Sequence, residues 1–238
     1  MNSFVLGIWT YPGVFAFAYM VYLFVDRFPP LLHLASEIGR RVDSSGGSGR
    51  TQEWTIYLQK FLGFLLLGPL LVVYGRVFSP GVEMGLGLPQ GPFLFWLGVV
   101  PSIVFLSSSI LRPTSKIPWE YYPQVRQPHW PPRRLLLNGL AWVFYHWGYE
   151  FAFRGFLFFP LVEIWGFEVA LGINVALYSL AHIFKGPGES FGAFFLGIGF
   201  CFVAYYTNSF YLPFLFHCIL ALGNDIKAIK AHPEMDFE

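Results

Sequence analysis

Long apolar stretches with very few charged side chains dominate this sequence, and residues 1–25 contain no Asp, Glu, Lys or Arg. A helix needs about 20 mostly apolar residues to cross the hydrocarbon core of a bilayer. Seven stretches reach or approach that length, at residues 4–25, 56–74, 93–111, 135–160, 167–184, 191–206 and 211–226. We therefore expect an all-α fold, a polytopic membrane helix bundle of about seven transmembrane helices.

The composition supports this class and excludes others. Only 12% of the residues are charged and 55% are hydrophobic, whereas a soluble domain carries about 25% charged residues. The net charge of +1 excludes a nucleic-acid binder that works by neutralising phosphates. Cys201 and Cys218 both lie in apolar runs, so neither a disulfide framework nor a cysteine-ligated zinc site is expected. The lipid bilayer is the expected partner, and we place the protein in the cell (inner or plasma) membrane.

Two hydrophilic stretches, residues 26–55 and 112–134, interrupt the apolar pattern, and we interpret both as connecting loops. With seven spans, the loops at residues 26–60, 112–134 and 185–190 and the C-terminal tail lie on one side of the membrane. All but two of the 15 lysines and arginines fall on that side; Arg76 lies on the other, and Arg154 lies within the fourth stretch. Because basic residues are retained in the cytoplasm, we expect the N-terminus outside and the C-terminus inside.

Ionisable and polar side chains inside apolar stretches are rare and mark function by default. Here they cluster after residue 134, which divides the chain into scaffold spans at 1–134 and a catalytic helix bundle at 135–238. Three of them follow each other at four-residue intervals and so share one helix face. The full set is His146, Glu150, Arg154, Tyr178, His182, Glu189, His217, Asn224 and Asp225.

Several of these residues also have an ordinary structural explanation. Glu150 and Arg154 are spaced to form an ion pair along one helix. A lone histidine in a span often makes an interhelical hydrogen bond, and Glu189 and Asp225 lie where water can solvate them. A carboxylate, a guanidinium and two histidines on three different spans are harder to explain separately. That combination suits hydrolysis, in which the carboxylate takes a proton from water and the histidines or an amide bind the water or the oxyanion.

Two histidines and a glutamate are also a metal-ligand set in principle. Their spacing is not that of the H-E-x-x-H motif, so the sequence does not favour zinc. We expect neither a metal nor another cofactor.

Three motifs resemble those of a known family. Residues 149–155, Tyr-Glu-Phe-Ala-Phe-Arg-Gly, resemble the first motif of the CAAX prenyl protease and bacteriocin-processing family of intramembrane glutamate-type endopeptidases. That motif has two adjacent glutamates, three residues and then arginine. Residues 178–182 resemble the second motif, an aromatic residue four positions before histidine. Residues 197–217 resemble the third, in which a glycine-rich helix and a short turn lead to a Leu-Pro helix start and histidine.

The resemblance implies an intramembrane endopeptidase that cleaves a membrane-associated peptide or protein with an activated water and no essential metal. By position it assigns Glu150 and Arg154 to the first motif, His182 to the second and His217 to the third. Tyr149 stands where the first glutamate of the family lies. The chain therefore resembles a divergent branch with a single glutamate.

In such a branch the single glutamate, Glu150, serves as the base, with Glu189 in support. Ala221 stands where an asparagine follows the last histidine in the family, and Asn224 or Asp225 replaces it one turn later. The alternative hypothesis is a catalytically inactive relative that acts as a membrane binding or resistance protein. A small transporter is a third hypothesis, but internal repeats, which many transporter folds show, are not visible here.

Overall fold

The computed structural model describes residues 3–42, 48–91 and 121–237. Within these ranges the chain is helical and has no β-strand, and a single isolated bridge pairs His129 with Asp236. The expected all-α helix bundle is therefore confirmed. The predicted span at residues 93–111 lies outside the described residues.

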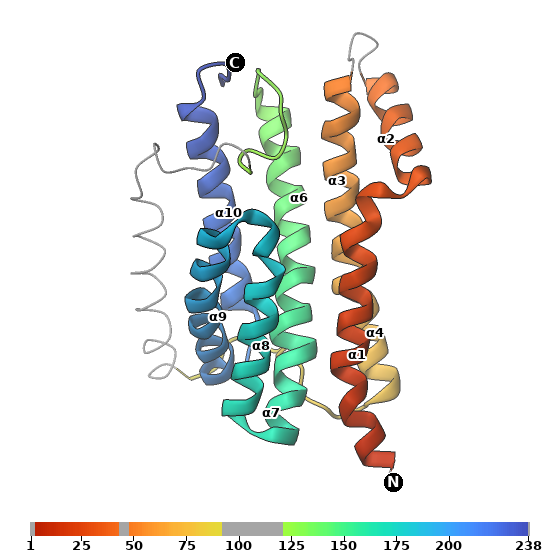
Figure 1. Ribbon diagram of the computed structural model, residues 1–238, viewed down its shortest axis with the longest axis vertical. Helices are drawn as coiled ribbons and strands as arrows, with labels where there is room; N and C mark the ends of the chain where they lie inside the picture. The colour runs from red at the N-terminus through yellow and green to blue at the C-terminus, as the bar shows by residue number, and fades with distance from the viewer. Residues whose placement is uncertain (1–2, 43–47, 92–120, 238) are drawn as a thin grey trace.

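The N-terminal half is built from helices that pack around α3. Figure 1 shows α1 and α3 side by side, with α2 beside the upper part of α3. Helices α3 and α4 follow one another across a break at Gly68. The elements are α1 (Ser3–Phe24), the short turn η1 (Val25–Arg27), α2 (Pro29–Val42), α3 (Ser48–Leu67) and α4 (Pro69–Phe78).

Our interpretation of residues 26–55 as a connecting loop was wrong for most of that segment, because α2 and the start of α3 lie within it. The charged residues of α2 lie on its exposed side, where Arg40 pairs with Glu37. Its other side has residues at four-residue spacing that face α3, and this amphipathic pattern is sufficient for a helix that packs on one side. The buried residues of α2 are Leu31, Ala35 and Gly39.

The C-terminal half begins with a continuous helical rod that stands between α1 and α3 on one side and α8, α9 and α10 on the other (Figure 1). This rod extends the predicted span at 135–160 at both ends. The elements are α6 (Pro132–Glu150), the π-helical segment η3 (Phe151–Phe158), α7 (Phe159–Trp165), α8 (Phe167–Ala181), the turn η4 (Ile183–Lys185), α9 (Pro187–Thr207) and α10 (Tyr211–Ala231).

The core is centred on η3, all of whose residues are buried. A segment that is apolar on every side must be surrounded by other helices, and here α1, α4, α8 and α9 contact it. Close backbone approach makes this possible at Gly148, where a Cβ atom would lie 2.9 Å from Cα of Phe64 on α3. The rod is thus held at the middle of the bundle, where its polar residues are shielded from lipid.

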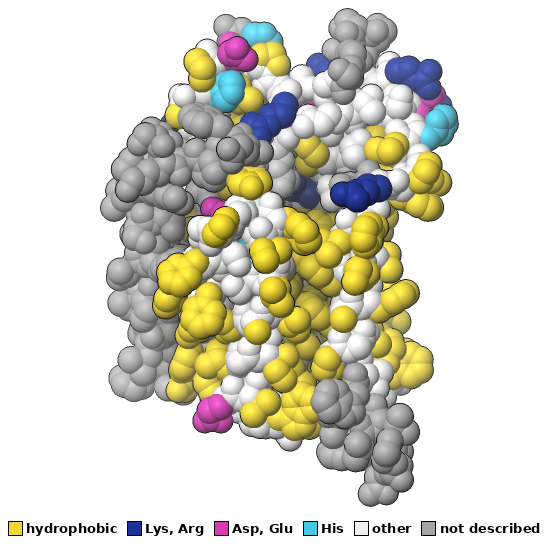
Figure 2. All heavy atoms as spheres, viewed as in Figure 1, with side chains coloured by type: hydrophobic (Ala, Val, Ile, Leu, Met, Phe, Trp, Pro, Cys, Tyr) yellow, Lys and Arg dark blue, Asp and Glu magenta, His cyan; other side chains and the backbone are white. Residues whose placement is uncertain are grey.

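The surface has two zones. Figure 2 shows hydrophobic side chains over the lower part of the molecule and Lys and Arg side chains near its upper end. Large apolar residues are exposed on several helices, including Phe17 on α1, Val73 on α4 and Phe191 on α9. This arrangement suits a protein whose apolar belt faces lipid and whose basic end lies at the cytoplasmic interface.

Three helical stretches of the described residues are long and apolar enough to cross a membrane: Gly49–Phe78, Pro187–Thr207 and Tyr211–Ala231. The bent pair Thr10–Phe24 and Pro29–Val42 adds a fourth if it forms one span. These helices indicate an integral membrane protein. The count of seven spans and their orientation stay predictions.

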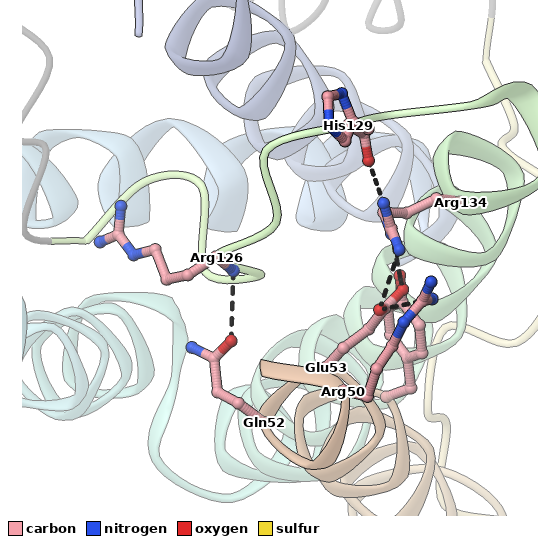
Figure 3. Close-up of polar contacts among 7 residues, drawn as sticks. Arg50, Gln52, Glu53, Arg126, His129 and Arg134 are labelled. Carbon is pink, nitrogen blue, oxygen red and sulfur yellow. Dashed lines mark hydrogen bonds and ion pairs between the residues drawn. The ribbon is translucent and has the colours of Figure 1, made fainter. Parts of the chain in front are cut away.

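A network of buried charges joins α3 to α6 at the basic end (Figure 3). Nε of Arg134 donates to Oε1 of Glu53 at 2.9 Å, and Arg134 also donates to the carbonyl oxygen of His129. Arg50 Nη1 lies 3.4 Å from Oε2 of Glu53, and the hydroxyl of Tyr57 donates to Oε1 at 3.2 Å. Every oxygen of this carboxylate therefore has a donor.

Candidate active site

The predicted catalytic residues come from three parts of the bundle. Glu150 is the last residue of α6 and Arg154 lies in η3, whereas His182 ends α8 and His217 lies in α10. Both α8 and α10 pack against the central rod. The structure thereby brings all four side chains to one region, although they are up to 67 positions apart in the sequence.

The π-helical segment directly follows Glu150. Single π-helical turns are rare and are found mostly at functional sites. Here Asn174 of α8 stabilises the segment, because its buried Nδ2 donates to the carbonyl oxygen of Phe153 at 2.6 Å. Our reading of the sequence did not select Asn174; an amide within the apolar run 167–181 was the available signal.

Glu150 links three helical elements and has no exposed surface. Its Oε1 accepts a hydrogen bond from Nδ1 of His217 at 2.5 Å and a longer one from the hydroxyl of Tyr178 at 3.5 Å. Its Oε2 lies 3.1 Å from Nη1 of Arg154. Each oxygen of the carboxylate therefore faces protein atoms rather than solvent.

Arg154 is fully buried and its positive charge is balanced by Glu150. The guanidinium carbon lies 4.0 Å from the centre of the Tyr178 ring and 5.3 Å from that of Phe200. Cation–π contacts of this kind stabilise a charge that has left water. None of the guanidinium nitrogens makes a hydrogen bond within the described parts of the chain.

The tautomers of two histidines follow from their partners. Nδ1 of His182 lies 2.8 Å from the carbonyl oxygen of Tyr178, and Nδ1 of His146 lies 2.9 Å from that of Trp142. A carbonyl oxygen only accepts hydrogen bonds, so each Nδ1 must carry the proton. In the neutral ring Nε2 then holds a free lone pair. His146, predicted only as a supporting residue, also lies close to His217, with ring centres 4.0 Å apart.

A cavity of about 180 Å³ opens beside these histidines, which is room for several water molecules. Its wall combines imidazoles, a cation, a carboxylate and an amide. Among the residues that line it are His146, His182, Lys185, Glu189, His217 and Asn224. The cavity therefore joins predicted residues from the second and third motifs with Glu189 and Asn224, two of the supporting candidates.

Lys185 and Tyr122 also line the cavity, and our reading of the sequence selected neither for the site. The ammonium of Lys185 lies 3.4 Å from the hydroxyl of Tyr122. Burial disfavours the ammonium, but Tyr122 and Glu189 outweigh that effect and raise the pKa of Lys185 above its usual value. Lys185 thus favours its charged form at a cavity wall that it shares with Glu189.

Tyr149, the residue directly before Glu150, is buried among aromatic rings. Its ring centre lies 4.8 Å from that of Phe153 and 6.3 Å from that of Tyr19 on α1. It also lies 5.6 Å from the ring of His217. Tyr149 is thus a packing residue next to Glu150.

Asp225 is buried away from the histidines, in a second polar cluster. Its Oδ2 accepts hydrogen bonds from Nε1 of Trp142 at 2.6 Å and from Nδ2 of Asn138 at 2.9 Å. Lys60 lies close by, with Nζ 3.9 Å from the centre of the Trp142 ring. We expected Lys60 to belong to a cytoplasmic loop; it is instead a buried residue of α3. The cluster ties α3 to α6 and α10 just beyond the cavity.

Within the described residues, no group of three or more His, Cys, Asp or Glu side chains is arranged to hold a metal ion.

Comparison with known families finds one match. Residues 131–222 match the model of the Rce1-like family, described as type II CAAX prenyl endopeptidase Rce1-like. The matched segment contains Glu150, Arg154, His182 and His217. Comparison with curated proteins and with solved structures finds no match.

Proposed function

We propose that the protein is an intramembrane endopeptidase, because residues 131–222 match the Rce1-like family model, described as type II CAAX prenyl endopeptidase Rce1-like. It hydrolyses a peptide bond with a water molecule that Glu150 and two histidines activate. The observation that carries the proposal is the hydrogen bond of 2.5 Å between Glu150 and His217 at the wall of a cavity that His182 also lines. A carboxylate–imidazole pair of this kind is a general way to move a proton at neutral pH.

The proposed reaction divides the chain into two parts. Residues 135–238 supply the catalytic side chains, and residues 1–134 form the scaffold. The two parts contact each other where α3 meets the rod closely at Gly148. In this arrangement the scaffold fixes the position of the rod that carries Glu150.

The substrate of the proposed enzyme is a peptide or protein associated with the membrane. The cavity lies among helices whose outer surfaces are apolar, with Phe184 and Phe191 exposed on the segments that flank it. A soluble peptide gains nothing from such surroundings, whereas a segment already at the bilayer has lost its water. Lys185 and Asn224 supply hydrogen-bond donors within the cavity for the polar backbone of that segment.

The test is peptidase activity of the purified full chain in lipid vesicles. Fluorogenic hydrophobic peptides serve as substrates, and mass spectrometry identifies the bond that is cleaved. We expect cleavage by the wild type and a loss of about 10²-fold or more in the His182→Ala and His217→Ala variants. Glu163→Gln is the matched control, because Glu163 is exposed on α7. Equal activity in the histidine variants and the control would refute the proposal.

A catalytically inactive relative is the second candidate, and the packing of Tyr149 favours it. This side chain is 3% exposed and lies among Tyr19, Tyr145 and Phe153. An inactive binding protein would hold hydrophobic peptides without cleaving them. If the folded protein binds the peptides but no preparation cleaves them, the result would support this candidate over the protease.

A further inference from the structure

Glu150 is separated from the cavity by His217. Glu150 has no exposed surface, and its two oxygens face His217, Tyr178 and Arg154. The side chain of His217 is 13% exposed and lines the cavity, whereas Glu150 is not among the lining residues. A group that takes a proton from water must reach that water directly or through one bridging molecule.

The ring of His217 has its two nitrogens in different surroundings. Nδ1 is bonded to the carboxylate of Glu150 at 2.5 Å. Nε2 lies on the opposite edge of the imidazole, so it is the nitrogen available to the cavity. Because an ionised carboxylate only accepts hydrogen bonds, the neutral ring has its proton on Nδ1 and a free lone pair on Nε2.

From this geometry we infer that the two residues have exchanged the roles expected from the sequence: His217 is the base that contacts the water, and Glu150 is a positioning residue that acts through it. The inference rests on the proposed peptidase function. Tyr149 supplies no acid. The Nδ1 atoms of His182 and His146 face backbone carbonyls, whereas Nδ1 of His217 faces the carboxylate of Glu150, which can stabilise a protonated ring. Of the three histidines that line the cavity, His217 is therefore the one best placed to receive the proton.

The steps balance as in other hydrolases that pair a carboxylate with histidine. Nε2 of His217 removes a proton from water while the water oxygen bonds to the carbonyl carbon of the scissile peptide. Glu150 stabilises the imidazolium that forms. The proton then passes from Nε2 to the leaving nitrogen as the carbon–nitrogen bond breaks, which yields an acid and an amine and regenerates neutral His217.

The other two histidines have a different role in this scheme. Nδ1 of His182 and of His146 donates to a backbone carbonyl, so their Nε2 atoms are acceptors. An acceptor can hold the second hydrogen of the attacking water but cannot donate to an oxyanion. Lys185 and Asn224 line the same cavity and carry N–H groups, so they are the donors available for the oxyanion.

The first experiment reads the tautomer of His217 by nitrogen-15 NMR on histidine-labelled protein in detergent micelles. The His217→Gln variant identifies the signal. We expect the proton on Nδ1 and an unprotonated Nε2 in the wild type, and a changed ratio of tautomers in Glu150→Gln at His217 but not at His182. A wild-type His217 with its proton on Nε2 would overturn the inference, whether or not the protein cleaves peptides.

The second experiment uses the vesicle peptidase assay. His217→Gly leaves a gap at the cavity wall that added imidazole and methylimidazoles can fill. We expect them to restore activity by about 10-fold or more, with rates that rise with the basicity of the added base. His146→Gly, at the same cavity, should show no such dependence. Absence of rescue, or rescue independent of basicity, would contradict a base role for His217. Absence of activity in the wild type would instead refute the proposed function.

Discussion

Glu53 and Glu150 are both buried carboxylates that pair with an arginine, but they differ in what else surrounds them. Around Glu53, Arg134, Arg50 and Tyr57 all supply donors, and the pair lies between two helices at the basic end of the bundle. Around Glu150, the arginine belongs to the same rod and leaves its N–H groups without hydrogen bonds among the described residues.

The difference separates a structural pair from a functional one. A network of buried charges stabilises a fold when every polar atom in it has a hydrogen-bond partner. A network with unpaired atoms lowers the stability of the fold, and such atoms often mark a functional site. Glu53 has its donors from α3 and α6 and no contact with the cavity at the histidines. Glu150 shares its carboxylate with His217, which faces that cavity. Substitutions at the two pairs should therefore change different properties.

The largest effect on stability is expected at Glu53. Glu53→Ala leaves Arg134 buried without its partner, which should lower the free energy of unfolding by about 3–5 kcal/mol. Denaturant unfolding in detergent measures it. The double variant Glu53→Ala/Arg134→Met should recover part of the loss, because it removes the unpaired charge. Glu37→Ala, at a pair on the exposed face of α2, is the control, and equal losses at both sites would contradict the comparison.

Arg154→Met should destabilise the protein by about 3 kcal/mol, the lower end of the range for breaking a buried ion pair. The loss is smaller than at Glu53 because Glu150 keeps His217 and Tyr178 as hydrogen-bond donors. The expected signs are a lower midpoint of thermal unfolding and a lower yield of folded protein. A thermal midpoint of the variant equal to that of the wild type would show that water reaches the ion pair.

Glu150→Gln should change activity far more than stability. Glutamine keeps the size of the side chain, but it carries no charge to stabilise an imidazolium at His217. We expect kcat/KM to fall by about 10²-fold or more, with a thermal midpoint close to that of the wild type. The purified variant is compared with Glu163→Gln in the vesicle assay. Full activity of Glu150→Gln would rule out the mechanism.

The smallest effect is expected at Glu189. This carboxylate lines the cavity near Lys185 rather than in hydrogen-bond contact with a histidine of the described chain. Glu189→Gln should lower kcat/KM by less than about threefold, as for other solvated charges. A loss as large as that of Glu150→Gln would show instead that Glu189 replaces the glutamate absent at Tyr149.

The sequence was sufficient for the class of fold, and its motifs selected residues that the structure brings together. Long runs without charge require helices in a bilayer, since no other element satisfies its own backbone there apart from a closed barrel. The three motifs selected Glu150, Arg154, His182 and His217, and His217 and Asn224, seven positions apart on α10, line the same cavity. A helix fixes which residues share a face, so the spacing of residues in the sequence predicts that face.

The order of the groups from the protein interior to the cavity depended on packing between helices. The rotation of each helix about its axis, and the depth at which it crosses its neighbours, decide which carboxylate oxygen faces which histidine. The periodicity of side chains along one helix gives no information on either. The same reason explains the burial of Lys60 and Asp225, which look solvated in sequence but meet across α3, α6 and α10. The π-helical segment after Glu150 depends likewise on Asn174 of another helix, and Glu150 lies behind His217 because α10 carries that ring between the carboxylate and the cavity.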